Sequence, residues 1–273
     1  MNGRTYNLKS ARLKAKRRKV IIGRIILAVF FFGGLWGSVY YLSGLNFITI
    51  SDVEVVGATS LATADIASTT EGFLQGRYFF TIPKSNIFFY PAKKIESTIL
   101  DSYSQVAHVG VSYKNSHAIT VSVIERSPKA LWCQGKPEQC YFLDDTGLIF
   151  SPFYQMEDTS LEFITFYSAE EKAEPMKLQY VSPDYFKKLL DFAEQLSSAG
   201  FKVTAFRERP DLDFEADFSG GQKIIFARDA DFSLVLKNFQ TLLVSSEFSD
   251  GKVFKNVEYV DLRFGNKVYY KER

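Results

Sequence analysis

Four acidic residues alternate with apolar residues in one short segment: Asp211, Asp213, Glu215 and Asp217. In an extended strand, side chains two positions apart lie on the same face, about 7 Å from each other. Carboxyl groups at this spacing could act as the acid and base of a glycosidase, or could together bind Ca²⁺. The apolar residues between and after them, Leu212, Phe214 and Phe218, predict instead a strand with one solvated face. We favour the solvated face and keep a hydrolase that uses the acidic strand 211–217 as the alternative.

Other residues that could perform chemistry are sparse. The two histidines, His108 and His117, lack the spacing to cysteines or acids that zinc sites and catalytic triads use. No glycine-rich phosphate loop and no GxSxG nucleophile motif occurs in the chain. Asp144 and Asp145 belong to a Leu-Asp-Asp-Thr-Gly run, which is typical of a tight turn. We therefore expect no catalysis, no metal, no cofactor and no small-molecule substrate.

The only cysteines, Cys133 and Cys140, bracket a turn-like segment that contains Gly135 and Pro137. The apolar runs on either side predict a β-hairpin, in which the two Cβ atoms would face each other at bridging distance. We expect a disulfide here. The alternative is a pair of free thiols, since a redox or zinc role would need a closer spacing or more ligands.

The charge of the chain is unevenly distributed. Nine of its 33 basic residues lie in the first 24 positions and the first acidic residue is Asp52, so the remainder carries 24 basic against 31 acidic residues. Residues 25–45 are uncharged and, as a helix, would extend about 31 Å, the thickness of the hydrocarbon core of a bilayer. Trp36, Tyr40 and Tyr41 lie where an interfacial aromatic belt would form. We predict a transmembrane helix over residues 21–45 in preference to a buried core helix.

The basic tail, residues 1–20, sets the expected orientation. The positive-inside rule keeps it in the cytoplasm and places the remaining chain outside the cytoplasmic membrane, where a disulfide is stable. A cleaved signal peptide is the alternative, but the sequence Gly-Ser-Val-Tyr-Tyr at 37–41 offers no small-residue cleavage site. We expect the tail and the helix to contact membrane lipid, and we expect no nucleic-acid partner.

Two domains are predicted outside the membrane, over residues 46–127 and 128–273. In the first, alternating apolar residues predict a strand over 47–57 with a bulge at Ser51-Asp52, and Ser60 is expected to cap a helix over 61–70. Pro91 is expected in the first turn of a second helix, and two strands over 106–114 and 118–126 are expected to meet at a turn. The order β-α-α-β-β predicts a small sheet covered by two helices.

The second predicted domain is a mostly antiparallel β domain backed by helices, so the fold class is α+β. Ser182-Pro183-Asp184 predicts the start of a helix that Gly200 ends, and a further helix is expected over about 232–245. Between them, the turn Ser219-Gly220-Gly221 joins the acidic strand to a strand over 223–227. A last strand includes residues 259–264.

An ordered set of motifs resembles one known family. The set consists of Phe-x-Ile-x-x-x-Val-x-Val-x-Gly over 47–57, Val-x-Val-x-Glu-Arg-x-Pro-x-Ala-x-Trp over 121–132, Leu-Asp-x-x-Gly over 143–147 and Tyr-Val-Asp-Leu-Arg-Phe over 259–264. With the basic tail and single anchor, it resembles the FtsQ/DivIB bacterial cell-division proteins over nearly the whole chain. The resemblance implies a POTRA domain (a polypeptide-transport-associated β-α-α-β-β fold) over 46–127 and the family's β domain over 128–273. It also implies a non-catalytic divisome scaffold at the division septum.

The same resemblance implies the partner and its contacts. A segment of an FtsB-like protein, itself paired with an FtsL-like protein, would add to the last strand by β-augmentation and so connect the divisome to septal peptidoglycan synthesis. We expect that strand to be an open edge, since only nine residues follow Phe264. The expected partner-binding residues are Tyr259, Val260, Asp261, Leu262, Arg263 and Phe264. Of these, Arg263 would pair with acids and Phe264 would fill an apolar pocket, whereas Val260 and Leu262 are also core candidates and Asp261 with Arg263 is also an ion-pair candidate. A membrane-anchored cell-envelope hydrolase remains the alternative.

Overall fold

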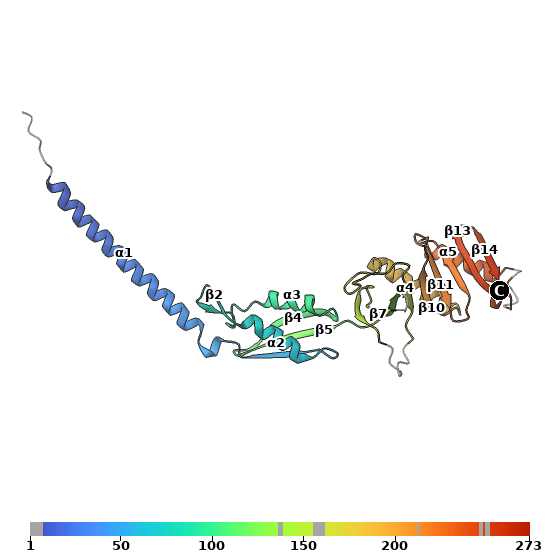
Figure 1. Ribbon diagram of the computed structural model, residues 1–273, viewed down its shortest axis with the longest axis horizontal. Coiled ribbons are helices and arrows are strands. Elements are labelled where there is room, and N and C mark those ends of the chain that lie inside the picture. The colour runs from blue at the N-terminus through green and yellow to red at the C-terminus, as the bar shows by residue number, and fades with distance from the viewer. Residues whose placement is uncertain (1–7, 136–138, 155–161, 212, 246–247, 249–251) are drawn as a thin grey trace, which may run out of the picture. The chain divides into compact units, whose positions relative to one another are not determined.

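The computed structural model of the 273-residue chain describes residues 8–135, 139–154, 162–211, 213–245, 248 and 252–273 (Figure 1). The chain forms two compact units, Met1–Glu125 and Arg126–Arg273. The boundary lies two residues before the predicted one, between Glu125 and Arg126 of the Glu-Arg-x-Pro motif. The first unit thus contains the basic tail, the apolar helix and a small sheet, and the second contains a large sheet.

One long helix, α1 (Leu8–Ser43), precedes the first sheet (Figure 1). Its segment Lys14–Ser43 is long and apolar enough to cross a membrane, and none of the most apolar stretch is buried against the described protein. A core helix of a soluble protein would be mostly covered, so the exposure of α1 is consistent with a single-pass membrane anchor.

The small sheet of the first unit has three strands in the order β1-β5-β4. β1 (Asp52–Val56) pairs in parallel with β5 (Ala118–Glu125), which pairs in antiparallel with β4 (Val106–Asn115). Two helices, α2 (Thr63–Leu74) and α3 (Ala92–Ser102), bury Ile66, Ile95 and Ile99 against the sheet. A two-stranded hairpin lies between α2 and α3, so the elements follow the predicted β-α-α-β-β order only apart from this insertion. Pro91 is the N-cap residue of α3 and does not lie in its first turn, where it had been predicted.

Three local details of the first unit differ from the prediction. Residues 47–51 do not extend the first strand, because η1 (Asn46–Ile48) is a 3₁₀ turn and the N–H groups of Ser51 and Asp52 both donate to the carbonyl of His117. Ser60 does not cap α2, whose first turn receives no side-chain cap. A short hairpin, β2 (Arg77–Tyr78) and β3 (Ile82–Pro83), was not predicted, because its strands are too short to show a pattern.

The carboxylate of Glu125 binds the loop that precedes α2. It accepts from the N–H groups of Thr59, Ser60 and Leu61 at 2.7, 3.0 and 3.2 Å, and from the hydroxyl groups of Thr59 and Ser60 at 3.0 and 2.6 Å. Desolvation opposes this arrangement, but the hydrogen bonds outweigh it and lower the pKa of Glu125 to about 2. The last residue of β5 thereby fixes the loop that leads into α2.

The second unit contains one nine-stranded sheet in the order β14-β13-β12-β11-β10-β9-β6-β7-β8. Five of its strand pairs are antiparallel, and three are parallel: β6/β9, β9/β10 and β12/β13. The sheet is therefore mostly antiparallel, as predicted. The strands are β6 (Ala130–Gln134), β7 (Gln139–Leu143), β8 (Ile149–Pro152), β9 (Thr165–Tyr167), β10 (Val203–Glu208), β11 (Phe214–Phe218), β12 (Lys223–Phe226), β13 (Val257–Phe264) and β14 (Lys267–Glu272).

Helices α4 (Pro183–Ser198), α5 (Phe232–Leu243) and the short α6 (Lys252–Lys255) complete the second unit. α4 begins and ends where the sequence predicted, with Ser182 before Pro183 and with Gly200 at φ 94° after its last turn. Its apolar residues Phe186, Leu189 and Leu196 join a core rich in phenylalanine, in which Phe166 stacks on Phe206 with ring centroids 5.2 Å apart. This core fixes the sheet that carries the site described next.

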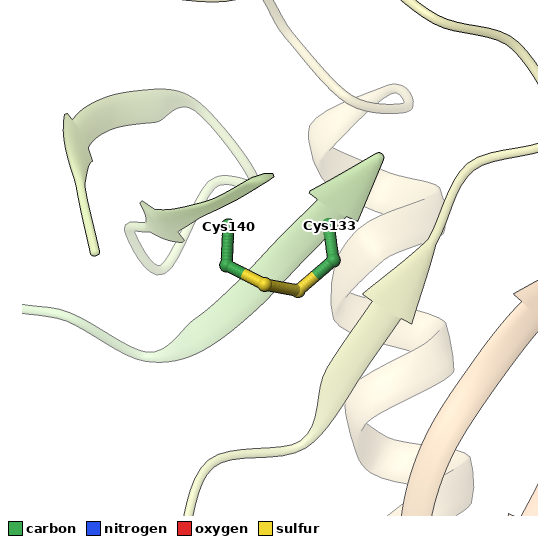
Figure 2. Close-up of a disulfide and its surroundings, with 2 residues drawn as sticks. All are labelled: Cys133 and Cys140. Atoms are coloured by element: carbon green, nitrogen blue, oxygen red, sulfur yellow. A yellow bond between two sulfur atoms is a disulfide. The ribbon is translucent and has the colours of Figure 1, made fainter. Parts of the chain in front are cut away.

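Figure 2 shows the disulfide between β6 and β7. Cys133 and Cys140 face each other in the antiparallel register, with Cα atoms 4.1 Å apart. The bond links the ends of the two strands next to their turn, whose residues 136–138 lie outside the described part of the chain. It therefore closes the hairpin that was predicted from the flanking apolar runs.

Candidate partner-binding edge

The expected binding strand lies inside the sheet and not at its edge. β13 pairs with β12 on one side and with β14 on the other, so the prediction of an open edge at residues 259–264 is wrong. Gly265, at φ 64°, allows a tight turn with Asn266, after which the chain returns antiparallel to β13. The last residues thus cover the strand that they were expected to leave bare.

The six predicted binding residues have different surroundings. Val260 and Leu262 are buried in the core, as their apolar character allowed. Asp261 is also buried, at 6% exposure, and lies on the opposite, polar face of β13. Tyr259 pairs with Lys271 of β14. Phe264 is 52% exposed at the turn, where its ring packs edge-on against Tyr269 at 5.3 Å.

Arg263 is enclosed by acids of its own chain. Its guanidinium donates to both carboxylate oxygens of Asp261, with an Nη2–Oδ2 distance of 2.7 Å. Its Nη1 donates to Asp211 at 2.9 Å and to Asp213 at 3.1 Å. The hydrogen bonds that Asp261 accepts from Arg263 raise the pKa of the guanidinium above its ordinary value. The acids that Arg263 was expected to meet on a partner are thus supplied by β13 and by the acidic segment.

The remaining acids of this segment also have basic partners. Arg207 donates to Asp217 at 2.7 Å, and Arg209 and Lys223 contact Glu215 at 3.2 and 2.6 Å. Phe214, Ala216 and Phe218 are buried on the other face, as the alternation predicted, whereas Leu212 lies outside the described residues. The acids of this segment therefore form ion pairs with bases from neighbouring strands, and these pairs extend across the four strands β10, β11, β12 and β13.

These pairings bear on the chemistry that the carboxylates can perform. A glycosidase needs one carboxylic acid with a raised pKa and a second carboxylate that faces the same bond. For Asp211, desolvation would raise the pKa, but the backbone hydrogen bond from Asp213 and the charges of Arg209 and Arg263 together lower it. Among the described residues, no group of three or more His, Cys, Asp or Glu side chains is placed to hold a metal ion. The carboxylates on this face of the sheet are held in ion pairs with bases of neighbouring strands.

Asp144 of the predicted turn is likewise occupied by its own backbone. It is buried, and its Oδ1 accepts from the N–H groups of Thr146 and Leu148 at 2.9 and 3.0 Å, while its Oδ2 pairs with Arg126 at 2.5 Å. Desolvation opposes ionisation, but these hydrogen bonds outweigh it and lower the pKa of Asp144. Its role is that of a turn residue, as the Leu-Asp-Asp-Thr-Gly pattern indicated.

β14 is the outermost strand on this side of the sheet among the strands that the structure describes. The N–H of Arg273 donates inward to the carbonyl of Asn256 at 2.8 Å. Because backbone N–H groups alternate between the two sides of a strand, the N–H of Glu272 points to the outer side. Tyr269 is 54% exposed beside this edge. The sequence analysis did not predict β14, because its Lys-Val-Tyr-Tyr-Lys run alternates only weakly between polar and apolar residues.

Comparison of the chain with protein-family models and with curated proteins found no match to either.

Proposed function

We propose that this protein is a non-catalytic, single-pass scaffold of the FtsQ/DivIB type, and that it captures a strand of an FtsB/FtsL-like partner by β-augmentation at β14. The observation that carries the proposal is the place of β14 as the outermost described strand of a nine-stranded sheet. An edge strand offers main-chain donors and acceptors in a row, to which an extended segment of another chain can pair. The β-α-α-β-β unit is, in this proposal, a POTRA-type domain.

The side chains of β14 suit a selective edge. Lys267 and Lys271 are exposed on it, and Lys271 forms a 2.6 Å ion pair with Glu258 of β13. Lysine on an edge strand disfavours indiscriminate strand pairing, because an added strand must offer compensating charge. Tyr269 and Phe264 form an exposed aromatic pair at the turn, which would provide a contact for one apolar side chain of the partner.

The membrane anchor determines the compartment in which the edge strand β14 would meet its partner. In the proposed orientation the basic tail stays in the cytoplasm. The small sheet of the first unit and the whole second unit lie on the other side of the cytoplasmic membrane, at the division septum. The disulfide between Cys133 and Cys140 supports this side of the membrane, because disulfides persist in oxidising compartments. Catalysis is not part of the proposal, since the described carboxylates of the acidic strand are each paired with a base.

Replacement of Glu272 by proline tests the edge. Proline removes the outward N–H of β14, whereas the matched control Glu272→Ala shortens the same exposed side chain and keeps that N–H. We expect the full-length Glu272→Pro variant to lose capture of the FtsB/FtsL-like proteins in a pull-down from co-expressing cells, and Glu272→Ala to retain it. A loss of about 1 kcal/mol or more, at least fivefold in affinity, is expected for one missing main-chain hydrogen bond. Equal capture by both variants would refute pairing at β14.

A further inference from the structure

Five phenylalanines of the first unit are exposed in three turns that follow α1 in the chain. Phe80 is 93% exposed, Phe79 83% and Phe88 75%. The whole set is Phe47, Phe79, Phe80, Phe88 and Phe89. Exposed apolar side chains are common singly, but a group of large ones marks a surface that contacts something else. We call these five residues the aromatic turns.

The aromatic turns are attached to the end of α1. The side-chain amide of Asn86, itself buried, donates to the carbonyl of Ser43 in the last turn of the helix at 2.9 Å. The hydroxyl of Ser43 donates to the carbonyl of Thr81 at 3.4 Å, and the guanidinium of Arg77 lies 4.4 Å above the ring of Tyr40. In Figure 1 the β2 hairpin lies at the end of the unit that α1 joins. Contacts within this unit therefore hold the turns beside the outer end of the apolar helix.

The backbone conformation at Phe79 and Phe80 holds both side chains in exposed positions. Both residues have positive φ, 47° and 60°, a conformation that bulky residues rarely adopt. Hydrogen bonds that converge on Thr81 hold them there: its N–H donates to the carbonyl of Tyr78 at 2.9 Å, its hydroxyl donates to the carbonyl of Phe79 at 2.9 Å, and its carbonyl accepts from Arg77 at 2.7 Å. Thr81 is buried. A strained turn that presents two aromatic rings to solvent indicates a function outside the fold itself.

Charge identifies the kind of surface that the turns fit. Residues 72–95 contain no acid and four bases, although the chain after residue 24 carries an excess of acids. Aromatic rings next to basic side chains, without acids, are typical of protein surfaces that lie in the interface of an anionic bilayer. Tyr40 and Tyr41 of α1 are themselves exposed where the interfacial belt was predicted.

We infer that the aromatic turns insert into the outer interface of the same bilayer that α1 crosses, with Phe79 and Phe80 entering the boundary between headgroups and acyl chains. The inference rests on α1 being a membrane anchor and does not depend on the partner proposed for β14. Arg77 and Lys84, in and beside the hairpin, would lie among anionic headgroups. Docking would orient the small sheet of the first unit on the membrane surface instead of leaving that sheet tethered by α1 alone.

Fluorescence of a single labelled site in the full-length protein tests this docking. Both native cysteines are joined in the disulfide, so a cysteine introduced by Phe80→Cys can be labelled selectively with an environment-sensitive dye. The matched control is Ala64→Cys, an exposed site in the first turn of α2, a helix of 12 residues and therefore about 18 Å long that leads toward the hairpin. Each protein is reconstituted into vesicles of phosphatidylcholine and phosphatidylglycerol, with nitroxide-labelled lipid or aqueous iodide as the quencher.

The dye at position 80 should emit at shorter wavelength than the dye at position 64. Since interfacial groups enter the bilayer by about 5–10 Å, nitroxide lipid should quench position 80 at least about threefold more strongly, and iodide should show the reverse order. With the dye kept at 80, the changes Phe79→Ser and Phe88→Ser should each weaken docking about tenfold. If these two changes unfold the hairpin, the comparison of positions 80 and 64 still decides the question.

Two results would overturn the inference. In one, iodide reaches position 80 as readily as position 64 and the nitroxide lipid has no selective effect, so the turns are in water. In the other, position 80 is shielded from iodide but not quenched by nitroxide lipid, and the shielding rises with the ratio of protein to lipid. The occupant would then be a second copy of the chain and not the lipid surface.

Discussion

Replacement of Arg263 by methionine should lower the stability of the second unit, and any loss of partner binding should follow from that loss of stability. The guanidinium serves three carboxylates, of which Asp261 is the least exposed, and it bridges β13 to the acidic segment 50 residues earlier. Methionine keeps much of the length of the side chain and removes the charge. Asp261, Asp211 and Asp213 would then lose the base that they share, and Asp211 would keep its contact with Arg209.

The magnitude follows from burial. Removal of one partner from a fully buried ion pair costs about 3–5 kcal/mol, and an exposed pair contributes about 0–1 kcal/mol. The side chain of Arg263 is 24% exposed and that of Asp261 9%. An intermediate loss of about 2–3 kcal/mol at pH 7 is therefore expected.

Urea unfolding of the full-length protein in detergent micelles measures this loss. The near-ultraviolet signal of Trp132, which is fully buried in the second unit, reports on unfolding there. The matched control is Arg207→Met, because Arg207 is 42% exposed and pairs with the single acid Asp217, so its loss should cost less than about 1 kcal/mol. If Arg263→Met is as stable as Arg207→Met at pH 7 and yet loses the partner, Arg263 is a contact residue and the reasoning here is wrong.

Two further changes test the supports of each unit. Glu125→Gln should lower the stability of the first unit by about 1–2 kcal/mol at pH 7, because charge-assisted hydrogen bonds to a partly exposed loop are lost. The pKa of Glu125 is lowered to about 2, so in the native protein this contribution should be fully present above pH 4.5, the ordinary pKa of a glutamate, and should be lost as the pH falls through about 2. Amide exchange of residues 59–61 measures both effects, and unchanged protection in the variant would contradict them. The double change Cys133→Ser and Cys140→Ser should cost about 2.5 kcal/mol, the loop-closure value for a loop of about eight residues. Reduction of the native protein should lower its urea midpoint equally, and a midpoint that reduction leaves unchanged would show that the bond contributes nothing.

Elements with strong local signals were predictable from the sequence. Pro183 and Gly200 mark the two ends of α4, because a first-turn proline and a positive φ depend only on neighbouring residues. The side chain of Ser182 precedes the helix as predicted but makes no capping hydrogen bond. The strands β4 and β5 matched their predicted ranges to within one residue, since both show alternation around a polar turn. The 3₁₀ turn at Asn46–Ile48 was missed because its apolar residues look like a strand, and only contact with residues 85–87 decides the conformation.

The position of a strand within a sheet was not predictable in the same way. β13 was identified as a strand with a buried Val260 and Leu262, but which strand is outermost depends on whether the following residues turn back. That decision is made by Gly265 and by a six-residue segment whose alternation is weak. The β2–β3 hairpin shows the same limit, because two-residue strands carry no periodicity and their conformation is fixed by Thr81 and by the end of α1.

The acidic strand shows why residue types alone cannot distinguish catalytic carboxylates from structural ones. The alternation predicted correctly that one face carries the carboxylates and the other is buried, but it contains no information on what lies beside that face. Arg207 comes from the strand before it, Lys223 from the strand after it, and Arg263 from a strand 50 residues farther along the chain. These carboxylates form ion pairs with those bases, whereas a general acid usually lies in an apolar cleft. The order of the strands, and not the spacing of the acids, therefore determines which bases lie beside the carboxylates.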